Sequence, residues 1–380
     1  MLNEWTEYAL EELLEYEQPT KYIVESTDYN DSYAIPVLTA GKSFILGYTN
    51  ETSGVQNKLP VIIFDDFTTS VQFVNFPFKV KSSAMKILHA NTEKVDPKFI
   101  FYRLQIIELD HSTHKRYWIQ QYSKIRVKIP SVLEQRRIVA RIEELFSQLD
   151  AGVETLKKTK AQLAAYRQAV LKKAFESVIS ESTTCNVEDV CKDIKVGIVI
   201  KPAQYYTSAD IGVRAFRSAN VREFAVNDSD WVYLTKAGHE ANLRSEIHTG
   251  DVLVVRSGYP GTACVVPPAY NGCNAIDILI AVPDVEKILP EYLCAYTNSP
   301  LGRKIVQEKK RGVAQAHFNV SGYSKTPIIV PCMKMQKRVV AEIDARLSEC
   351  DSIEQTVDTA LQQAEAMRQS ILKDAFEGRL

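Results

Sequence analysis

The fold of this chain is decided by a segment that occurs twice, as IPSVLEQRRIVARIEELFSQLDAGVETLKKTKAQLAAYRQAVLKKAFES at residues 129–177 and as VPCMKMQKRVVAEIDARLSECDSIEQTVDTALQQAEAMRQSILKDAFEG at residues 330–378. The copies align without a gap at an offset of 201 residues. A single register of this length indicates an internal repeat. The matched positions include Pro130/Pro331, Gln135/Gln336, Arg137/Arg338, Arg167/Arg368, Leu171/Leu372 and Phe175/Phe376.

Each copy predicts one long helix. Apolar residues recur at steps of three, four and seven, as at Ile138, Ile142 and Leu145, which is the pattern of paired helices. Ser131 and Glu134 form a capping box at the first helix start, and about 43 residues at 1.5 Å each give a rod of roughly 65 Å. We expect the copies to pair antiparallel, because the chain crosses a globule before it returns. The alternative is two separate helices, each packed on its own globule.

The segments that precede the helices repeat more weakly. Residues 59–64 align with residues 250–255 at an offset of 191. These segments contain short β-branched runs bounded by turn residues, and Pro97 and Pro290 mark expected helix starts. The sequence predicts an α+β protein with a pseudo-twofold repeat, in which two mixed α/β globules are separated by two long helices that form an antiparallel coiled coil. The expected parts are a first globule at residues 1–128, a helical segment at 129–180, a second globule at 181–329 and a second helical segment at 330–380.

Composition limits the classes of function. The 380 residues include 46 Lys+Arg and 47 Asp+Glu, a net charge of −1, which argues against a uniformly basic coat for nucleic acid. The charge is uneven, because residues 1–33 hold nine acidic residues and one Lys, whereas residues 34–128 hold thirteen basic and seven acidic residues. Local basic surface can bind phosphates. No run is apolar enough to span a membrane and no secretory signal is evident, so we expect a cytoplasmic protein. Seven Cys residues without a CxxC pair predict buried free thiols.

Motifs of catalysis are missing from the sequence. It contains no P-loop, GxGxxG, HExxH, GxSxG or EF-hand pattern. Val266-Pro-Pro-Ala-Tyr270 does not match the motif of DNA amino-methyltransferases, in which Asn, Asp or Ser precedes Pro-Pro-Tyr/Phe. Asp65-Asp66 is the one paired carboxylate considered for a metal, and a turn role is favoured for it. We predict no catalytic, cofactor-binding or metal site in this chain.

Polar residues of the kind that read DNA bases follow several predicted strands. Arg256-Ser-Gly-Tyr-Pro-Gly261 would project Arg256 and Tyr259 from a tight turn. Arg pairs bidentately with guanine, and Asn or Gln pairs with adenine. For each such residue the alternative is a role in the fold of its loop. The predicted DNA-binding residues are Thr39, Lys42, Lys81, Ser82, Ser83, His114, Lys115, Arg116, Tyr117, Arg217, Asn220, Arg256, Ser257, Tyr259, Arg311, Gln315 and His317.

The sequence closely resembles the DNA-specificity subunits of type I restriction–modification systems over essentially the whole chain. The resemblance rests on the duplicated helical pattern, which opens P-x4-Q-[RK]-R-[IV]-V-A and closes L-K-x-A-F-E, and on residues 35–42 and 250–261. It implies that each globule is a target recognition domain that reads half of a bipartite double-stranded DNA site. It also implies that the helices form an antiparallel spacer, that two methyltransferase subunits dock on the conserved regions, and that two restriction subunits supply ATP-driven translocation and cleavage.

The resemblance further implies where the chemistry lies. The chain would be a non-catalytic subunit of a DNA adenine methyltransferase and ATP-dependent endonuclease complex. S-adenosylmethionine would bind the methyltransferase partner, and ATP and Mg would bind the restriction partner. Met333 and Met335 depart from the pattern of the first copy, which leaves the start of the second helix less sharply defined. The alternatives are a fused restriction enzyme with its own methyltransferase or nuclease activity, and a coiled-coil adaptor without DNA contact.

A rod between two readers would act as a ruler for the gap between half-sites. Readers that meet the same face of the duplex lie near whole helical turns apart, about 10–10.5 bp each. A rod of roughly 65 Å, at about 3.4 Å per base pair, therefore limits the gap to about two turns.

Overall fold

The computed structural model describes residues 5–39, 43–107, 117–304 and 319–380. The chain forms two compact units. Unit 1 comprises residues 1–157 and 358–380, and unit 2 comprises residues 158–357. Each unit therefore holds one globule together with half of each long helix. No helix within the described ranges is long and apolar enough to cross a membrane.

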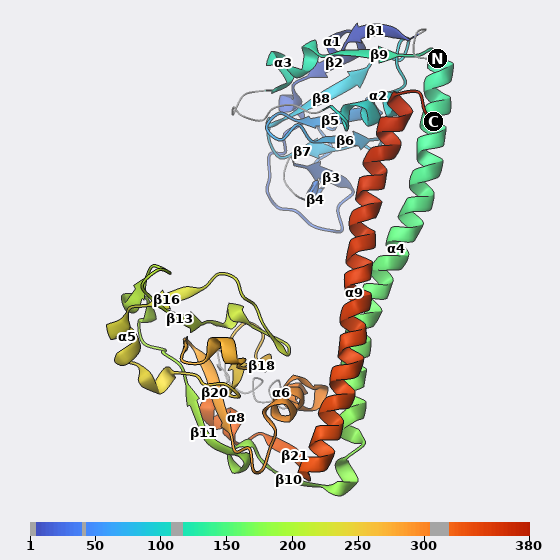
Figure 1. The fold of residues 1–380 in the computed structure, drawn as a ribbon. Coiled ribbons are helices and arrows are strands. Elements are labelled where there is room, and N and C mark those ends of the chain that lie inside the picture. Colours follow the sequence, from blue (N-terminus) through green and yellow to red (C-terminus); the bar gives the residue numbers. More distant parts are fainter. Residues whose placement is uncertain (1–4, 40–42, 108–116, 305–318) are drawn as a thin grey trace. The chain divides into compact units, whose positions relative to one another are not determined.

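The repeated segments form two long helices, α4 (Val132–Glu176) and α9 (Met333–Phe376), which run side by side in opposite directions (Figure 1). The Ser131 hydroxyl accepts a hydrogen bond from the Glu134 N–H at 3.4 Å at the start of α4. Apolar residues near both ends of each helix are buried in shared cores with the globules. The predicted antiparallel pair is confirmed, and packing on a globule accompanies it. The helix residues buried in these cores include Ile142, Phe146, Leu372 and Phe376 in unit 1, and Leu171, Phe175, Val339 and Ile343 in unit 2.

Ion pairs join the two helices at matched repeat positions. In unit 2, Arg167 of α4 donates to Asp351 at 2.5 Å and to Glu354 at 3.0 Å on α9. In unit 1, Arg368 of α9 pairs with Asp150 of α4. Arg167 and Arg368, like Asp150 and Asp351, lie 201 positions apart. Each pair is thus the image of the other, so the repeat in the sequence extends to the contacts between the helices.

Unit 1 is built on a four-stranded antiparallel sheet with the order β2-β8-β5-β6. Alternate residues of β5 point to opposite faces. Ile62 and Phe64 pack with α2, and Val61 and Ile63 face a second core. Smaller sheets have the orders β4-β3-β7 and β1-β9. The elements are β1 (Thr6–Ala9), α1 (Leu10–Leu13), β2 (Leu14–Glu17), β3 (Ile35–Leu38), β4 (Ile45–Thr49), β5 (Val61–Asp65), β6 (Val71–Val74), β7 (Lys79–Val80), β8 (Met85–Ala90), α2 (Pro97–Leu104), α3 (Tyr117–Gln120) and β9 (Arg126–Ile129).

Unit 2 repeats this topology with the order β11-β20-β17-β18 in its four-stranded antiparallel sheet. Leu253 pairs with Ile280 across β17 and β20, as Ile62 pairs with Leu88 across β5 and β8. Further sheets have the orders β12-β16-β13-β19, β10-β21 and β14-β15. The elements are β10 (Ser182–Asn186), β11 (Cys191–Val196), β12 (Tyr206–Thr207), β13 (Val213–Phe216), β14 (Val221–Arg222), β15 (Ala225–Val226), β16 (Val232–Leu234), α5 (Lys236–Glu240), β17 (Val252–Val255), β18 (Ala263–Val265), β19 (Asn274–Ala275), β20 (Ile278–Pro283), α6 (Pro290–Asn298), α8 (Val320–Ser324) and β21 (Pro327–Pro331).

A fully buried glutamine near the start of each long helix ties that helix to its globule; we call this residue the glutamine anchor. Gln135 Oε1 accepts from the Asp96 N–H at 2.7 Å. Its Nε2 donates to the carbonyls of Lys94 at 3.1 Å and Pro130 at 2.9 Å. The matched Gln336 makes the same three kinds of bond in unit 2, at Leu289, Lys287 and Pro331.

All seven cysteines are free thiols. Cys264, Cys273, Cys294 and Cys350 are buried, as expected. Cys332 is exposed just before α9, so the expectation of burial is wrong there. The other two, Cys185 and Cys191, are half-buried.

Candidate nucleic-acid interface

In unit 1, two parallel strands bring several predicted DNA-binding residues to one sheet edge. Strands β3 and β7 are parallel neighbours with Leu38 opposite Val80, so their carboxyl ends meet at the same edge. Thr39 follows β3, and residues 81–83 follow β7. The Lys81 N–H donates to the Leu38 carbonyl at 2.9 Å, and Lys81, Ser82 and Ser83 are exposed. Residues some forty positions apart in sequence are thus adjacent, with side chains accessible to a ligand.

Unit 2 has a second parallel pair at the equivalent place. Strand β13 is parallel to β19, with Phe216 opposite Ala275. Arg217 follows β13, as Thr39 follows β3. Asp277 follows β19 with a left-handed φ of 52°, which places a carboxylate where unit 1 has Lys81-Ser82. The backbone geometry of the edge is repeated, but the side chains that it carries are different.

Arg256 is held by this carboxylate. Its Nη1 lies 2.6 Å from Asp277 Oδ1, and its side chain is 14% exposed. The predicted projection of Arg256 toward a base is therefore opposed by an ion pair within the fold. Tyr259, from the same turn, is 86% exposed. Gly258 has a φ of 77°, which a residue with a side chain rarely adopts. The turn thus fixes Arg256 and leaves Tyr259 free to contact a ligand.

A hollow of about 600 Å³ in unit 2 joins two of the predicted segments. Ser257 and Tyr259 line it from one turn, and Ser218 lines it from the segment after Arg217. The hollow also includes Arg222, Glu223 and Arg303, which are not among the predicted DNA-binding residues. Arg303 pairs with Glu223, and Arg222 lies beside them on β14. A basic run around Arg303 could have pointed to that residue, whereas nothing local marks the short hairpin that carries Arg222 and Glu223.

Two predicted DNA-binding residues belong to the interior. Asn220 is fully buried, and its amide donates to the carbonyls of Asn227 at 3.2 Å and Ser229 at 2.8 Å. Its Oδ1 accepts from the Arg217 N–H at 3.0 Å. Tyr117 is 2% exposed and packs in the core of unit 1. Both side chains are used by the fold and are not available at the surface of this structure.

Other predicted residues lie outside the described part of the chain. They are Lys42, His114, Lys115, Arg116, Arg311, Gln315 and His317.

Asp65, the last residue of β5, holds a turn, as favoured from the sequence, whereas Asp66 contacts residues outside the turn. Asp65 accepts from the Phe67 N–H at 2.9 Å and from the Thr68 hydroxyl at 2.6 Å. Asp66 accepts from the Trp118 N–H at 2.9 Å and lies 3.6 Å from Lys86. Across the described ranges, no three His, Cys, Asp or Glu side chains group as metal ligands.

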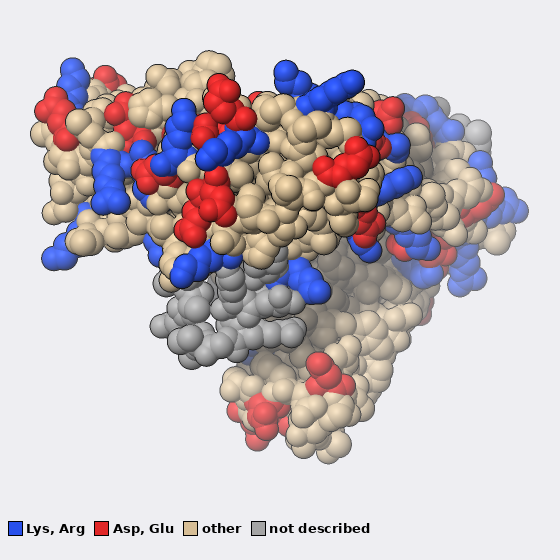
Figure 2. Space-filling model, turned by 90° about the horizontal axis from the view of Figure 1, so that it is seen from below, with Lys and Arg blue, Asp and Glu red and all other residues tan. Residues whose placement is uncertain are grey.

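Charge on the surface is mixed. Figure 2 shows a face on which Lys and Arg side chains are interspersed with Asp and Glu side chains. This agrees with the net charge of −1. A net charge close to zero gives only weak long-range attraction to a polyphosphate.

Comparison with known protein families gives consistent matches. The family model of the type I restriction modification DNA specificity domain matches residues 3–165. The specificity subunit of the type I restriction enzyme EcoR124I/EcoR124II from Escherichia coli is 35% identical over 364 residues, which cover 90% of this chain and 86% of that protein. The EcoKI specificity subunit from Escherichia coli K12 is 25% identical and covers 68% of this chain and 58% of its own length.

Solved structures share the fold. A chain from a study of complex assembly and conformational transition in a type I R-M system has a TM-score of 0.72 at 16% identity, covering 99% of this chain and 98% of its own. The HsdS subunit from Thermoanaerobacter tengcongensis has a TM-score of 0.50 at 17% identity, covering 99% and 97%.

Proposed function

Because the chain belongs to the family of DNA specificity subunits of type I restriction–modification systems, we propose that each of its globules reads one half of a bipartite DNA site. The observation that carries this proposal is the repeated sheet edge. The parallel pairs β3/β7 and β13/β19 present equivalent loops, yet Lys81-Ser82-Ser83 stand in one unit and the Arg256–Asp277 pair in the other. Equivalent scaffolds with different side chains suit two readers of different sequences.

The long helices carry the second part of the proposal, which is that they set the gap between the half-sites and dock two methyltransferase subunits. In contrast to the globules, the helices conserve their contacts between the two repeats, as in the Arg167–Asp351 and Arg368–Asp150 pairs and the two glutamine anchors. Two similar helix surfaces, one in each repeat, suit two copies of one partner.

The remaining partners and cofactors follow from the same assignment. Two restriction subunits would add ATP-driven translocation and cleavage. S-adenosylmethionine would bind the methyltransferase partner, and ATP and Mg would bind the restriction partner, while this chain supplies no catalytic group. The alternative, a fused enzyme with its own activity, predicts methylation or cleavage of DNA by this chain alone. Activity of the chain without partners would therefore reject the non-catalytic role.

A domain exchange tests the two-reader proposal. We expect that replacing residues 184–329 with the second globule of a related subunit changes one half-site and leaves the other half-site and the gap unchanged. Methylome sequencing of cells that carry the complete system reads both half-sites and the gap in one experiment. The reciprocal exchange of residues 5–128 is the matched control and should change the opposite half-site. A change in both half-sites after either exchange contradicts the proposal.

A further inference from the structure

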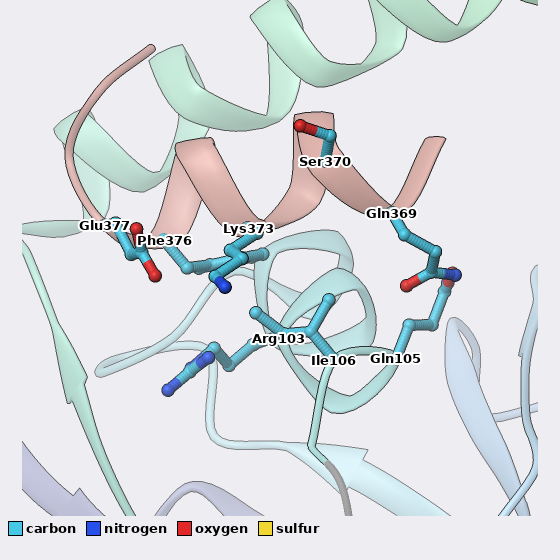
Figure 3. Close-up of a pocket in the computed structure, with 8 residues that line it drawn as sticks. All are labelled: Arg103, Gln105, Ile106, Gln369, Ser370, Lys373, Phe376 and Glu377. Carbon is cyan, nitrogen blue, oxygen red and sulfur yellow. The ribbon is translucent and has the colours of Figure 1, made fainter. Parts of the chain in front are cut away.

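A recess of about 580 Å³ lies within unit 1, between the end of α2 and the C-terminal turns of α9 (Figure 3). Arg103, Gln105 and Ile106 line it from α2 and the residues that follow, and Gln369, Lys373 and Phe376 line it from α9. Figure 3 shows Arg103 and Lys373 at one end of the recess and the two glutamine side chains at the other end. The volume is in the range typical of sites for small ligands, about 300–1,000 Å³.

Arg103 and Lys373 are the two cations that line this recess. Within the described residues, neither Arg103 nor Lys373 makes an ion pair. Burial lowers the pKa of Arg103, as expected for a guanidinium that is removed from water without a carboxylate partner. Glu377 also lines the recess, but its carboxylate pairs with Arg379. Among the described residues, the recess therefore holds two cations that no ion pair neutralises.

The equivalent place in unit 2 differs in the two features that create this charge. Tyr296 of α6 stands where α2 has Arg103, and it packs edge-on against Phe175 with ring centroids 5.2 Å apart. Tyr296 is 4% exposed and fills that position. In unit 1, the Arg103 guanidinium lies 5.5 Å from the ring centroid of the matched Phe376.

Lys373 of unit 1 corresponds to Lys172 of unit 2, but the two lysines differ in their ion pairs. Lys172 lies 3.7 Å from Glu176 in unit 2. In unit 1 the corresponding glutamate, Glu377, pairs with Arg379 instead, and Lys373 is left exposed. The two repeats thus differ at this place in two respects: unit 1 has the additional cation Arg103, and its glutamate Glu377 pairs with Arg379 rather than with the matched lysine.

We propose that this recess binds a phosphate group. Arg offers a planar fork of donors and Lys a mobile point charge, a combination that suits phosphate oxygens. The side-chain amides of Gln105 and Gln369 offer neutral donors at the other end of the recess. The phosphate could belong to the DNA backbone or to a free nucleotide, because both present the same oxygens. The inference does not depend on half-site reading, since phosphate contacts carry no sequence information.

The test uses the full chain and three variants. Arg103→Tyr introduces the residue that unit 2 has at this place, and Lys373→Met removes an exposed charge with little effect on packing. Lys172→Met removes the matched lysine of unit 2 and is the control. One measurement is the calorimetric titration of each protein with pyrophosphate and with ATP. The other is the anisotropy of a labelled duplex of arbitrary sequence at salt concentrations from about 50 to 200 mM.

We expect Arg103→Tyr and Lys373→Met each to weaken the binding of either DNA or free nucleotides. Lys172→Met should leave the binding of both unchanged. If the source is DNA, the slope of log K against log salt falls by about 1 in each variant and free nucleotides do not bind. If the source is a nucleotide, the dissociation constant rises about tenfold or more and the duplex slope is unchanged. The proposal is overturned if both measurements remain at wild-type values in Lys373→Met, whatever the stability of Arg103→Tyr.

Discussion

Replacing Gln135 with Leu tests whether the glutamine anchors hold the long helices to their globules. The side chain is fully buried and bonds the Asp96 N–H and the carbonyls of Lys94 and Pro130 at 2.7–3.1 Å. Leu has a similar size but no polar group, so all three backbone groups lose their partner. Leaving a buried polar group unsatisfied costs about 1–3 kcal/mol. A shift of the loop would let water reach some of the three backbone groups, so the full sum is not expected. We expect the local free energy of unfolding to fall by about 3 kcal/mol.

Hydrogen exchange on the full chain, followed by mass spectrometry, measures this loss where it arises. A change of about 3 kcal/mol corresponds to roughly a 100-fold loss of protection in peptides that cover residues 94–96 and the first turns of α4. Gln148→Leu is the matched control, because Gln148 is exposed on the same helix in the same unit. Peptides that cover residues 287–289, beside the second anchor, should keep wild-type protection.

Gln336→Leu should give the mirror result, with protection lost at residues 287–289 and retained at residues 94–96. A loss below about 1 kcal/mol in both variants, the net value of a single hydrogen bond, would refute the anchoring role. So would an equal loss at both anchors after either substitution, because the two glutamines share no partner.

Three further results are expected. Glu17 is partly buried, which raises its pKa, but hydrogen bonds from Lys21, His89 and Tyr22 outweigh burial and lower the pKa from 4.5 to about 2. The ionised carboxylate therefore stabilises unit 1 above pH 4.5 by up to about 3 kcal/mol. This contribution to stability disappears as the pH falls toward 2. Thermal melts of wild type and Glu17→Gln should accordingly differ at pH 6 and converge near pH 2.5, and a constant difference would contradict the assignment. Tyr259→Ala should leave the melting temperature unchanged, because the side chain is 86% exposed, and should weaken binding of the cognate duplex by the assembled methyltransferase; unchanged affinity removes Tyr259 from the interface. Four residues inserted after Leu156, with a matched insertion after Val357 to keep the helices in register, should lengthen the gap and leave both half-sites unchanged, whereas altered half-sites with the original gap would reject the ruler.

The long helices could be predicted from the sequence because their information is local. The spacing of Ile138, Ile142 and Leu145 specifies a helix and its buried face, and a repeat without gaps supplies the partner. The turn at Asp65 is local in the same way, because its carboxylate accepts from the Phe67 N–H and the Thr68 hydroxyl. The contacts of Asp66 with Trp118 and Lys86 are not local and could not be predicted in this way.

The candidate interface could be predicted only in part because its side chains are controlled by distant residues. Arg256 was assigned to base reading from its turn, but the carboxylate that holds it belongs to Asp277, 21 positions away. Asn220 has the right chemistry for adenine, yet its amide is consumed by two carbonyls of a later loop. Tyr259 meets both conditions, because it carries a suitable group and is 86% exposed, and among the described residues so do the exposed Lys81, Ser82 and Ser83 of unit 1.

The interactions between the helices imply a particular kind of symmetry. Asp150 contacts Arg368, and its repeat image Asp351 contacts Arg167, the image of Arg368. In a dimer of identical chains, reciprocal contacts of this form define an isologous interface, in which residue i meets residue j and j meets i. The helix pair therefore has the contact pattern of a two-fold dimer within one chain. Asymmetry enters where the globules differ, at the strand edges and at Arg103 in place of Tyr296, which are the places where a different ligand would require different side chains.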